Sequence, residues 1–202
     1  MPEQRFIDNL FPIPLHGVVL NQEEMIPIQK EMESALDKVT WTRPDGWGQT
    51  HDLSTNNFYF DSIKEYKMDE FKKLIDRELR IYSEYLEFEY RDYKSFSWFS
   101  KFKPGDFGHQ HIHGTADISG VYYYQTNGND GDIYFSSPVS AGESSLCYRT
   151  FNQFWNHQPK VGKLLLFPGW LNHGIKRNES QDVRISFAFN IFFERFEWMH
   201  ST

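Results

Sequence analysis

The sequence contains a single cysteine, Cys147, among its 202 residues. One cysteine cannot form an intramolecular disulfide, which favours a reducing compartment. The sequence also has no C-x-x-C pair, no nucleophile elbow and no glycine-rich phosphate-binding loop. These absences argue against a disulfide scaffold, thiol catalysis and a nucleotide-binding enzyme.

Long apolar runs and a surplus of positive charge are missing too. The densest apolar run, LLLF at 164–167, is soon interrupted by Pro168 and Gly169, so no membrane span is expected. The N-terminal residues lack the basic and apolar segments of a signal peptide. The formal net charge of −7 disfavours nucleic acid as a partner, because that affinity depends on neutralising phosphates. We expect a soluble, cytoplasmic protein with neither a membrane nor a nucleic-acid partner.

Aromatic residues, in contrast, are abundant, at 18% of the chain. Helical spacing of apolar residues predicts helices over 22–38, with Pro27 near the helix start, and over 69–86, with Asp69 as the N-cap. From about residue 94, short aromatic and β-branched runs alternate with turn residues, a pattern typical of strands. The predicted strands are 94–102, 117–125, 131–138, 144–151, 162–167, 171–177 and 182–193.

This order of elements predicts a mainly β fold with N-terminal helices (α+β), a double-stranded β-helix of the jelly-roll, cupin-like type. The length suits one domain over 1–202. Within it, we expect a helical region over 1–92 to brace a β-helix core over 93–202.

Three histidines lie within five residues in the stretch HQHIHG, which begins at His109. His111 and His113 are two residues apart, so on an extended chain their side chains share a face and could grip one metal ion. The pair alone is weak evidence, because a solvated loop would also tolerate these residues. It therefore predicts either a metal site or a polar loop.

A second polar segment follows the run LLLFPGW. His173 lies after a Pro-Gly turn, and Arg184 begins a strand of clear alternation. Ser186, Ala188 and Asn190 share a face with Arg184, opposite the apolar residues. An arginine inside a β-fold is costly unless it meets an anion, which could be a bound carboxylate or an internal acid. An exposed position at the strand end is the other alternative.

The histidine pair, the distal histidine and the arginine together resemble the 2-oxoglutarate- and Fe(II)-dependent oxygenases. The chain is most similar to small members from phages and marine bacteria, close to the prolyl-hydroxylase branch. The resemblance rests on LFPIP at 10–14 and, more specifically, on the segments 96–123 and 162–190. It implies a β-helix that binds Fe(II) and 2-oxoglutarate, with O2 as the oxidant.

The resemblance implies roles for individual residues. His111 and His173 correspond to iron ligands, and His113 stands where the superfamily usually has a carboxylate. We assign His113 as the third ligand, with Asp117 as the alternative. We expect His109 either to contact a ligand side chain without touching the metal or to lie in a solvated loop. Arg184 would bind the distal carboxylate of 2-oxoglutarate. Further candidates for the cofactor site are Ser186, Tyr123, Tyr122 and Asn190, and Trp98 and Trp170 are candidates for the mouth.

The implied reaction is hydroxylation of a small-molecule or peptidyl substrate, a prolyl side chain among the candidates, with decarboxylation of 2-oxoglutarate to succinate. Two alternatives stay open. One is a three-histidine, cupin-like metalloenzyme that does not use 2-oxoglutarate. The other is a non-enzymatic jelly roll with a binding or structural role. The sequence does not indicate the oligomeric state.

Overall fold

Two antiparallel sheets and three helices make up the part of the chain that this computed structural model describes, residues 12–45, 50–57, 59–138 and 154–195. The larger sheet has the order β1-β8-β5-β10-β3-β2 and the smaller one β4-β9-β6-β7. The helices are α1 (Gln22–Leu36), α2 (Ser62–Glu65) and α3 (Asp69–Tyr85). The strands are β1 (His16–Val19), β2 (Asp52–Leu53), β3 (Tyr93–Phe102), β4 (Gly108–His111), β5 (Ile118–Gln125), β6 (Ile133–Ser136), β7 (Phe154–His157), β8 (Lys163–Pro168), β9 (His173–Ile175) and β10 (Arg184–Phe193).

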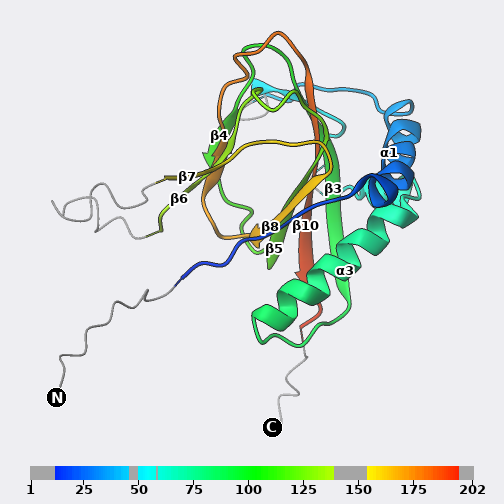
Figure 1. Ribbon diagram of the computed structural model, residues 1–202, viewed down its shortest axis with the longest axis vertical. Coiled ribbons are helices and arrows are strands. Elements are labelled where there is room, and N and C mark those ends of the chain that lie inside the picture. Colours follow the sequence, from blue (N-terminus) through cyan, green and yellow to red (C-terminus); the bar gives the residue numbers. More distant parts are fainter. Residues whose placement is uncertain (1–11, 46–49, 58, 139–153, 196–202) are drawn as a thin grey trace, which may run out of the picture.

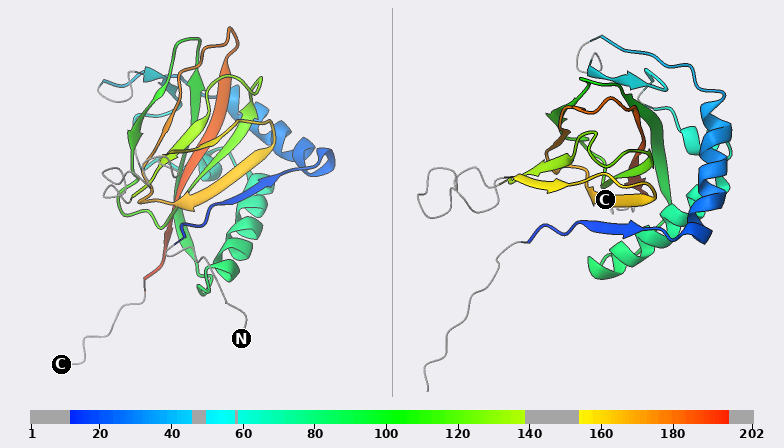
Figure 2. Two further views of the ribbon diagram at one scale, coloured as in Figure 1. Left: turned by 60° about the vertical axis from the view of Figure 1, so that its left-hand side comes forward. Right: turned by 45° about the horizontal axis from the view of Figure 1, so that its top comes forward.

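The fold class predicted from the sequence is confirmed: the two sheets face one another, and the helices cover the outer side of the larger sheet (Figures 1 and 2). The described strands do not close into a barrel. None of the helices that the described residues form is long and apolar enough to cross a membrane.

Apolar residues fill both sides of the larger sheet. On the outer side, Phe187 and Phe189 of β10 pack edge-on against Phe71 of α3. Gly120 of β5 accommodates this layer, since a Cβ there would come within 2.2 Å of the Phe189 ring. On the inner side, residues of β5, β6 and β8 form a second cluster between the sheets. Strand β8 is buried on both faces, which explains its uninterrupted apolar run.

The sequence predictions hold for most elements, with some differences. The predicted strand 144–151, including Cys147, lies outside the described residues. The short edge strands β1 and β2 within the predicted helical region were not anticipated, because each is defined by its pairing with β8 or β3.

The predicted N-cap role of Asp69 is wrong. Helix α3 begins at Asp69 itself, and its cap residue makes no side-chain hydrogen bond. The Glu31 carboxylate of α1 instead accepts hydrogen bonds from the backbone N–H groups of Glu70 and Phe71, at 2.9 and 3.0 Å. A residue distant in sequence thus satisfies free donors at the helix start.

Candidate metal centre

Three imidazole rings meet at one end of the smaller sheet. His111 ends β4 and is paired directly with His173, the first residue of β9. His113 follows two residues after His111. Its backbone N–H donates a hydrogen bond to the carbonyl of Gly169 at 2.8 Å. One ligand atom from each of the three rings lies within 4.8 Å of the other two. These separations would let all three rings contact a single metal ion.

Hydrogen bonds orient two of these rings. The Nδ1 atom of His111 lies 2.7 Å from the carbonyl oxygen of His109, and Nδ1 of His173 lies 2.8 Å from that of Leu171. A carbonyl oxygen only accepts, so Nδ1 carries the proton and Nε2 keeps its lone pair. Burial lowers the pKa of His173 to about 3, so the ring is neutral near pH 7. Burial lowers the pKa of His111 as well, so both rings are in the state that binds metal.

The third ring, His113, is oriented by side chains. Nδ2 of Asn190 lies 3.3 Å from Nδ1 of His113, and the Ser119 hydroxyl donates to Oδ1 of Asn190 at 2.8 Å. A half-turn of the Asn190 amide would present Oδ1 to His113 and Nδ2 to Ser119. His113 would then donate from Nδ1 and leave Nε2 free, like the other two rings. Burial and the neighbouring rings lower the pKa of His113.

Two of the candidate residues take other positions. The Asp117 carboxylate accepts from the backbone N–H of Phe193 at 2.9 Å and from Arg195 at 2.6 Å. It is not part of the histidine cluster. The ring of His109 is exposed and packs edge-on against Phe107, so His109 reaches the site through its carbonyl only.

Arg184 lies on the inner face of the larger sheet and is fully buried. Its Nη1 donates to the carbonyl of Gly131 at 2.6 Å, and its guanidinium lies 4.0 Å from the centre of the Phe102 ring. Nε and Nη2 are buried without a hydrogen-bond partner, and so is the Tyr123 hydroxyl, among the residues that the structure describes. Arg184 is therefore neither exposed nor in an ion pair with a described acid, the two alternatives that the sequence left open.

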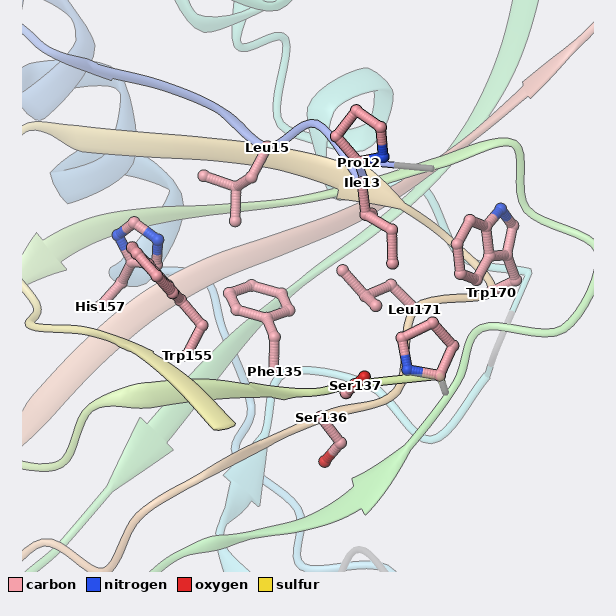
Figure 3. A pocket seen from close by; sticks show the side chains of 11 residues that line it. Pro12, Ile13, Leu15, Phe135, Ser136, Ser137, Trp155, His157, Trp170 and Leu171 are labelled. Carbon is pink, nitrogen blue, oxygen red and sulfur yellow. The ribbon is translucent and has the colours of Figure 1, made fainter. Parts of the chain in front are cut away.

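A small cavity of about 60 Å³ lies between the two sheets beside the three histidines. Ser186 and Trp98, two of the candidate residues, line it. Tyr122 is a wrong prediction, because it lies on the opposite face of β5 and packs against Phe71 with ring centres 5.3 Å apart. Asn190 shares the inner face but contacts His113 and Ser119. Trp170 lines a separate groove (Figure 3).

Among the cavity residues that sequence reasoning missed, His51 is the titratable one. It is only 3% exposed and stacks in parallel on Phe102, with ring centres 4.3 Å apart. Burial and the charge of Arg184 lower the pKa of His51 to about 4, so this ring is neutral as well. The segment around His51 carries no motif, and only the pairing of β2 with β3 brings it to the cavity.

Residues 96–190, which include the three histidines and Arg184, match the family model described as "Putative 2OG-Fe(II) oxygenase". This core of the chain is therefore similar to the 2OG-Fe(II) oxygenase family. The predicted enzyme class, a 2-oxoglutarate-dependent oxidoreductase, is therefore confirmed, as are Fe(II) and 2-oxoglutarate at the level of the family. No curated protein matches the sequence.

Solved structures share the fold at low sequence identity. A prolyl-4-hydroxylase from Pseudomonas putida is 11% identical with a TM-score of 0.61, over 90% of this chain and 94% of that one. HygX from Streptomyces hygroscopicus, solved with nickel and 2-oxoglutarate, is 13% identical with a TM-score of 0.61, over 91% and 84%. The epimerase SnoN from nogalamycin biosynthesis is 12% identical with a TM-score of 0.63, over 90% and 78%.

Proposed function

We propose that His111, His113 and His173 hold Fe(II) and that Arg184 binds 2-oxoglutarate in a dioxygenase that hydroxylates its substrate. One observation carries this assignment. Three neutral imidazoles line the cavity between the sheets, and the fully buried guanidinium of Arg184 packs on Phe102 of the cavity wall, with two donors that have no partner among the described residues. A metal and a dicarboxylic acid would satisfy both groups at once.

The donor set fits Fe(II), since imidazole is a common ligand of this metal. His111, His113 and His173 would hold the metal and would leave part of its coordination shell open to the cosubstrate and O2. When bound, Fe(II) and 2-oxoglutarate supply the oxidising chemistry, in which one atom of O2 enters the product and the other enters succinate. The tautomers fixed by His109 and Leu171 keep two ligand atoms aimed at the metal.

Arg184 fits the distal carboxylate of 2-oxoglutarate. Its Nε and Nη2 atoms can donate two parallel hydrogen bonds to one carboxylate, and the Tyr123 hydroxyl can add a third. Ser186 is two residues from Arg184 on the inner face of β10, in register with Tyr123, and can donate a further hydrogen bond. A buried guanidinium that forms no ion pair with a described acid gains most from such an anion. This feature favours 2-oxoglutarate over a three-histidine enzyme that does not use it.

The substrate is a small molecule or a peptide. Two relatives of the same fold indicate this range: one is a prolyl-4-hydroxylase and another was solved with hygromycin B bound. A prolyl side chain and a small molecule are both compatible with the site. The expected absence of nucleic-acid partners and the cytoplasmic location remain predictions.

The assignment is tested by anaerobic titration of the protein with Fe(II) and then 2-oxoglutarate. A visible charge-transfer band that requires both is expected, and exposure to O2 should then release succinate. A chain that binds Fe(II) but gives neither the band nor succinate would instead be a metalloenzyme independent of 2-oxoglutarate.

Replacing Asn190 with alanine is expected to weaken Mn(II) binding about 10- to 100-fold, since it removes the partner that orients His113. Calorimetric titration measures this loss. Ser119→Ala is the graded control, because it removes only the bond to Asn190 and should have a smaller effect. Unchanged affinity in Asn190→Ala would mean that the amide does not position the ring.

Asp117→Asn is expected to leave Mn(II) affinity within about twofold, because this carboxylate contacts Phe193 and Arg195. Arg195 is exposed, so the free energy of unfolding should fall by at most about 1 kcal/mol. A loss of metal affinity of tenfold or more would make Asp117 a ligand.

A further inference from the structure

A groove of about 910 Å³ opens beside the metal centre, between the smaller sheet and the segment that precedes β1 (Figure 3). Ile13 and Leu15 point from that segment toward Phe135 and Leu171 on the opposite wall. Trp155 and Trp170 lie at its sides and are 55% and 51% exposed. The volume is within the range of sites that bind small molecules.

The groove is adjacent to the metal centre through the register of the smaller sheet. Phe135 of β6 is paired with His173 of β9, and Trp155 of β7 is paired with Phe135. The rings of Phe135 and His173 are 5.9 Å apart, and the Leu171 carbonyl accepts from His173. The end of the groove at Phe135 and Leu171 is therefore its metal end. Because adjacent strands are about 5 Å apart, Trp155 lies about 10 Å from His173.

The chemistry of the wall restricts the occupant. None of the eleven described residues that line the groove is an aspartate, glutamate, lysine or arginine. Burial lowers the pKa of His157, the titratable side chain among them, so this ring is neutral near pH 7. Ser136 and Ser137 add hydroxyl groups at one side. A charged molecule in this groove would lose hydration without gaining a partner, whereas an apolar one would lose little.

We propose that this groove is the substrate site and that the substrate is an uncharged, mainly apolar small molecule, bound with its reactive end toward Phe135. The proposal rests on the proposed function, since it needs a metal at the histidines. The aromatic side chains would stack on rings of the substrate, and the serines would bind one or two of its oxygen atoms.

Two fluorescent probes that share one ring system test this directly. N-phenyl-1-naphthylamine is uncharged, and 8-anilino-1-naphthalenesulfonate carries a sulfonate on the same skeleton. The uncharged probe is expected to bind at least about tenfold more tightly. Equal affinity for the two probes, or no binding of the uncharged one, would overturn the proposal.

Variants locate the probe. Ile13→Asp adds a charge to the wall and Trp155→Ala removes an exposed ring, and each should weaken binding of the uncharged probe about tenfold. Tyr85→Ala is the matched control, because Tyr85 is an exposed ring on α3, away from the groove. Unchanged affinity in both groove variants would show that the probe binds elsewhere, which would overturn the proposal. Affinity that falls as protein concentration rises would mean that a second copy covers the groove.

The distance between the bound probe and the metal tests the groove assignment separately from the proposed oxygenase function. Mn(II) at the histidines should broaden the NMR lines of the bound probe, and diamagnetic Zn(II) should not. Sharp probe lines in protein that binds Mn(II) and 2-oxoglutarate would overturn the groove assignment and leave the oxygenase intact. Protein that binds the probe but no metal would contradict both.

Discussion

The His173→Ala variant is expected to bind Mn(II) at least about 100-fold more weakly than the unmodified chain. His173 is the most buried of the three rings and is held on two sides, by the Leu171 carbonyl at Nδ1 and by the rings of Phe135 and Phe167. No described acid is part of the cluster, so no neighbouring carboxylate replaces the lost ligand. Calorimetry measures the affinity.

His109→Ala is the matched control, because it removes a histidine of the same segment whose ring is exposed. The His109 carbonyl, which orients His111, stays in place in this variant. Affinity within about threefold of the unmodified chain is expected. Equal losses in the two variants would contradict the assignment of the ligands.

A second readout is the melting temperature. A metal at 100 times its dissociation constant stabilises the folded state by about 2.7 kcal/mol. Mn(II) should therefore raise the melting temperature of the unmodified chain and of His109→Ala, but not that of His173→Ala. A metal-induced rise in His173→Ala would place the metal elsewhere.

The alternation of residues along β10 was enough to predict the two faces of that strand. Arg184 and Ser186 lie inward and Phe187 and Phe189 lie against α3, as a period of two requires. The same rule separates Tyr122 from Tyr123 but does not say which one faces inward. The pairing of Tyr123 with Ser186 decides it, and that register depends on contacts about 60 residues apart in sequence.

Other parts of the site depend on contacts that leave no local pattern. Asn190 meets His113 across 77 residues, so the spacing of residues predicts its inward direction but not its partner. His51 comes from a short segment on the edge of β3, and its residues have no periodicity to interpret. The sequence therefore predicted the histidines and the arginine, which carry a motif, and missed residues that only the tertiary structure brings to the cavity.

Arg184→Met is expected to weaken 2-oxoglutarate binding about 30-fold or more while leaving the free protein at least as stable. The guanidinium is fully buried, and two of its donors have no partner among the described residues. Replacing a buried charge with an apolar side chain of similar volume is often neutral or stabilising, by about 1 to 4 kcal/mol. The lost bond to Gly131 and the contact with Phe102 offset part of this gain. Denaturant unfolding without 2-oxoglutarate measures the balance.

The affinity of Arg184→Met for 2-oxoglutarate should fall, although the stability of the variant does not. Removing one partner of a buried, hydrogen-bonded charge pair costs about 2 to 5 kcal/mol, which corresponds to a loss of 2-oxoglutarate affinity of about 30-fold or more. Anaerobic titration of the Fe(II) protein measures it through the charge-transfer band. Arg184→Lys is the control: it keeps the charge but loses the planar pair of donors, so it should bind with intermediate affinity. A Met variant that binds 2-oxoglutarate normally but unfolds more easily would make Arg184 a structural residue, because only a ligand-binding arginine combines lost affinity with retained stability.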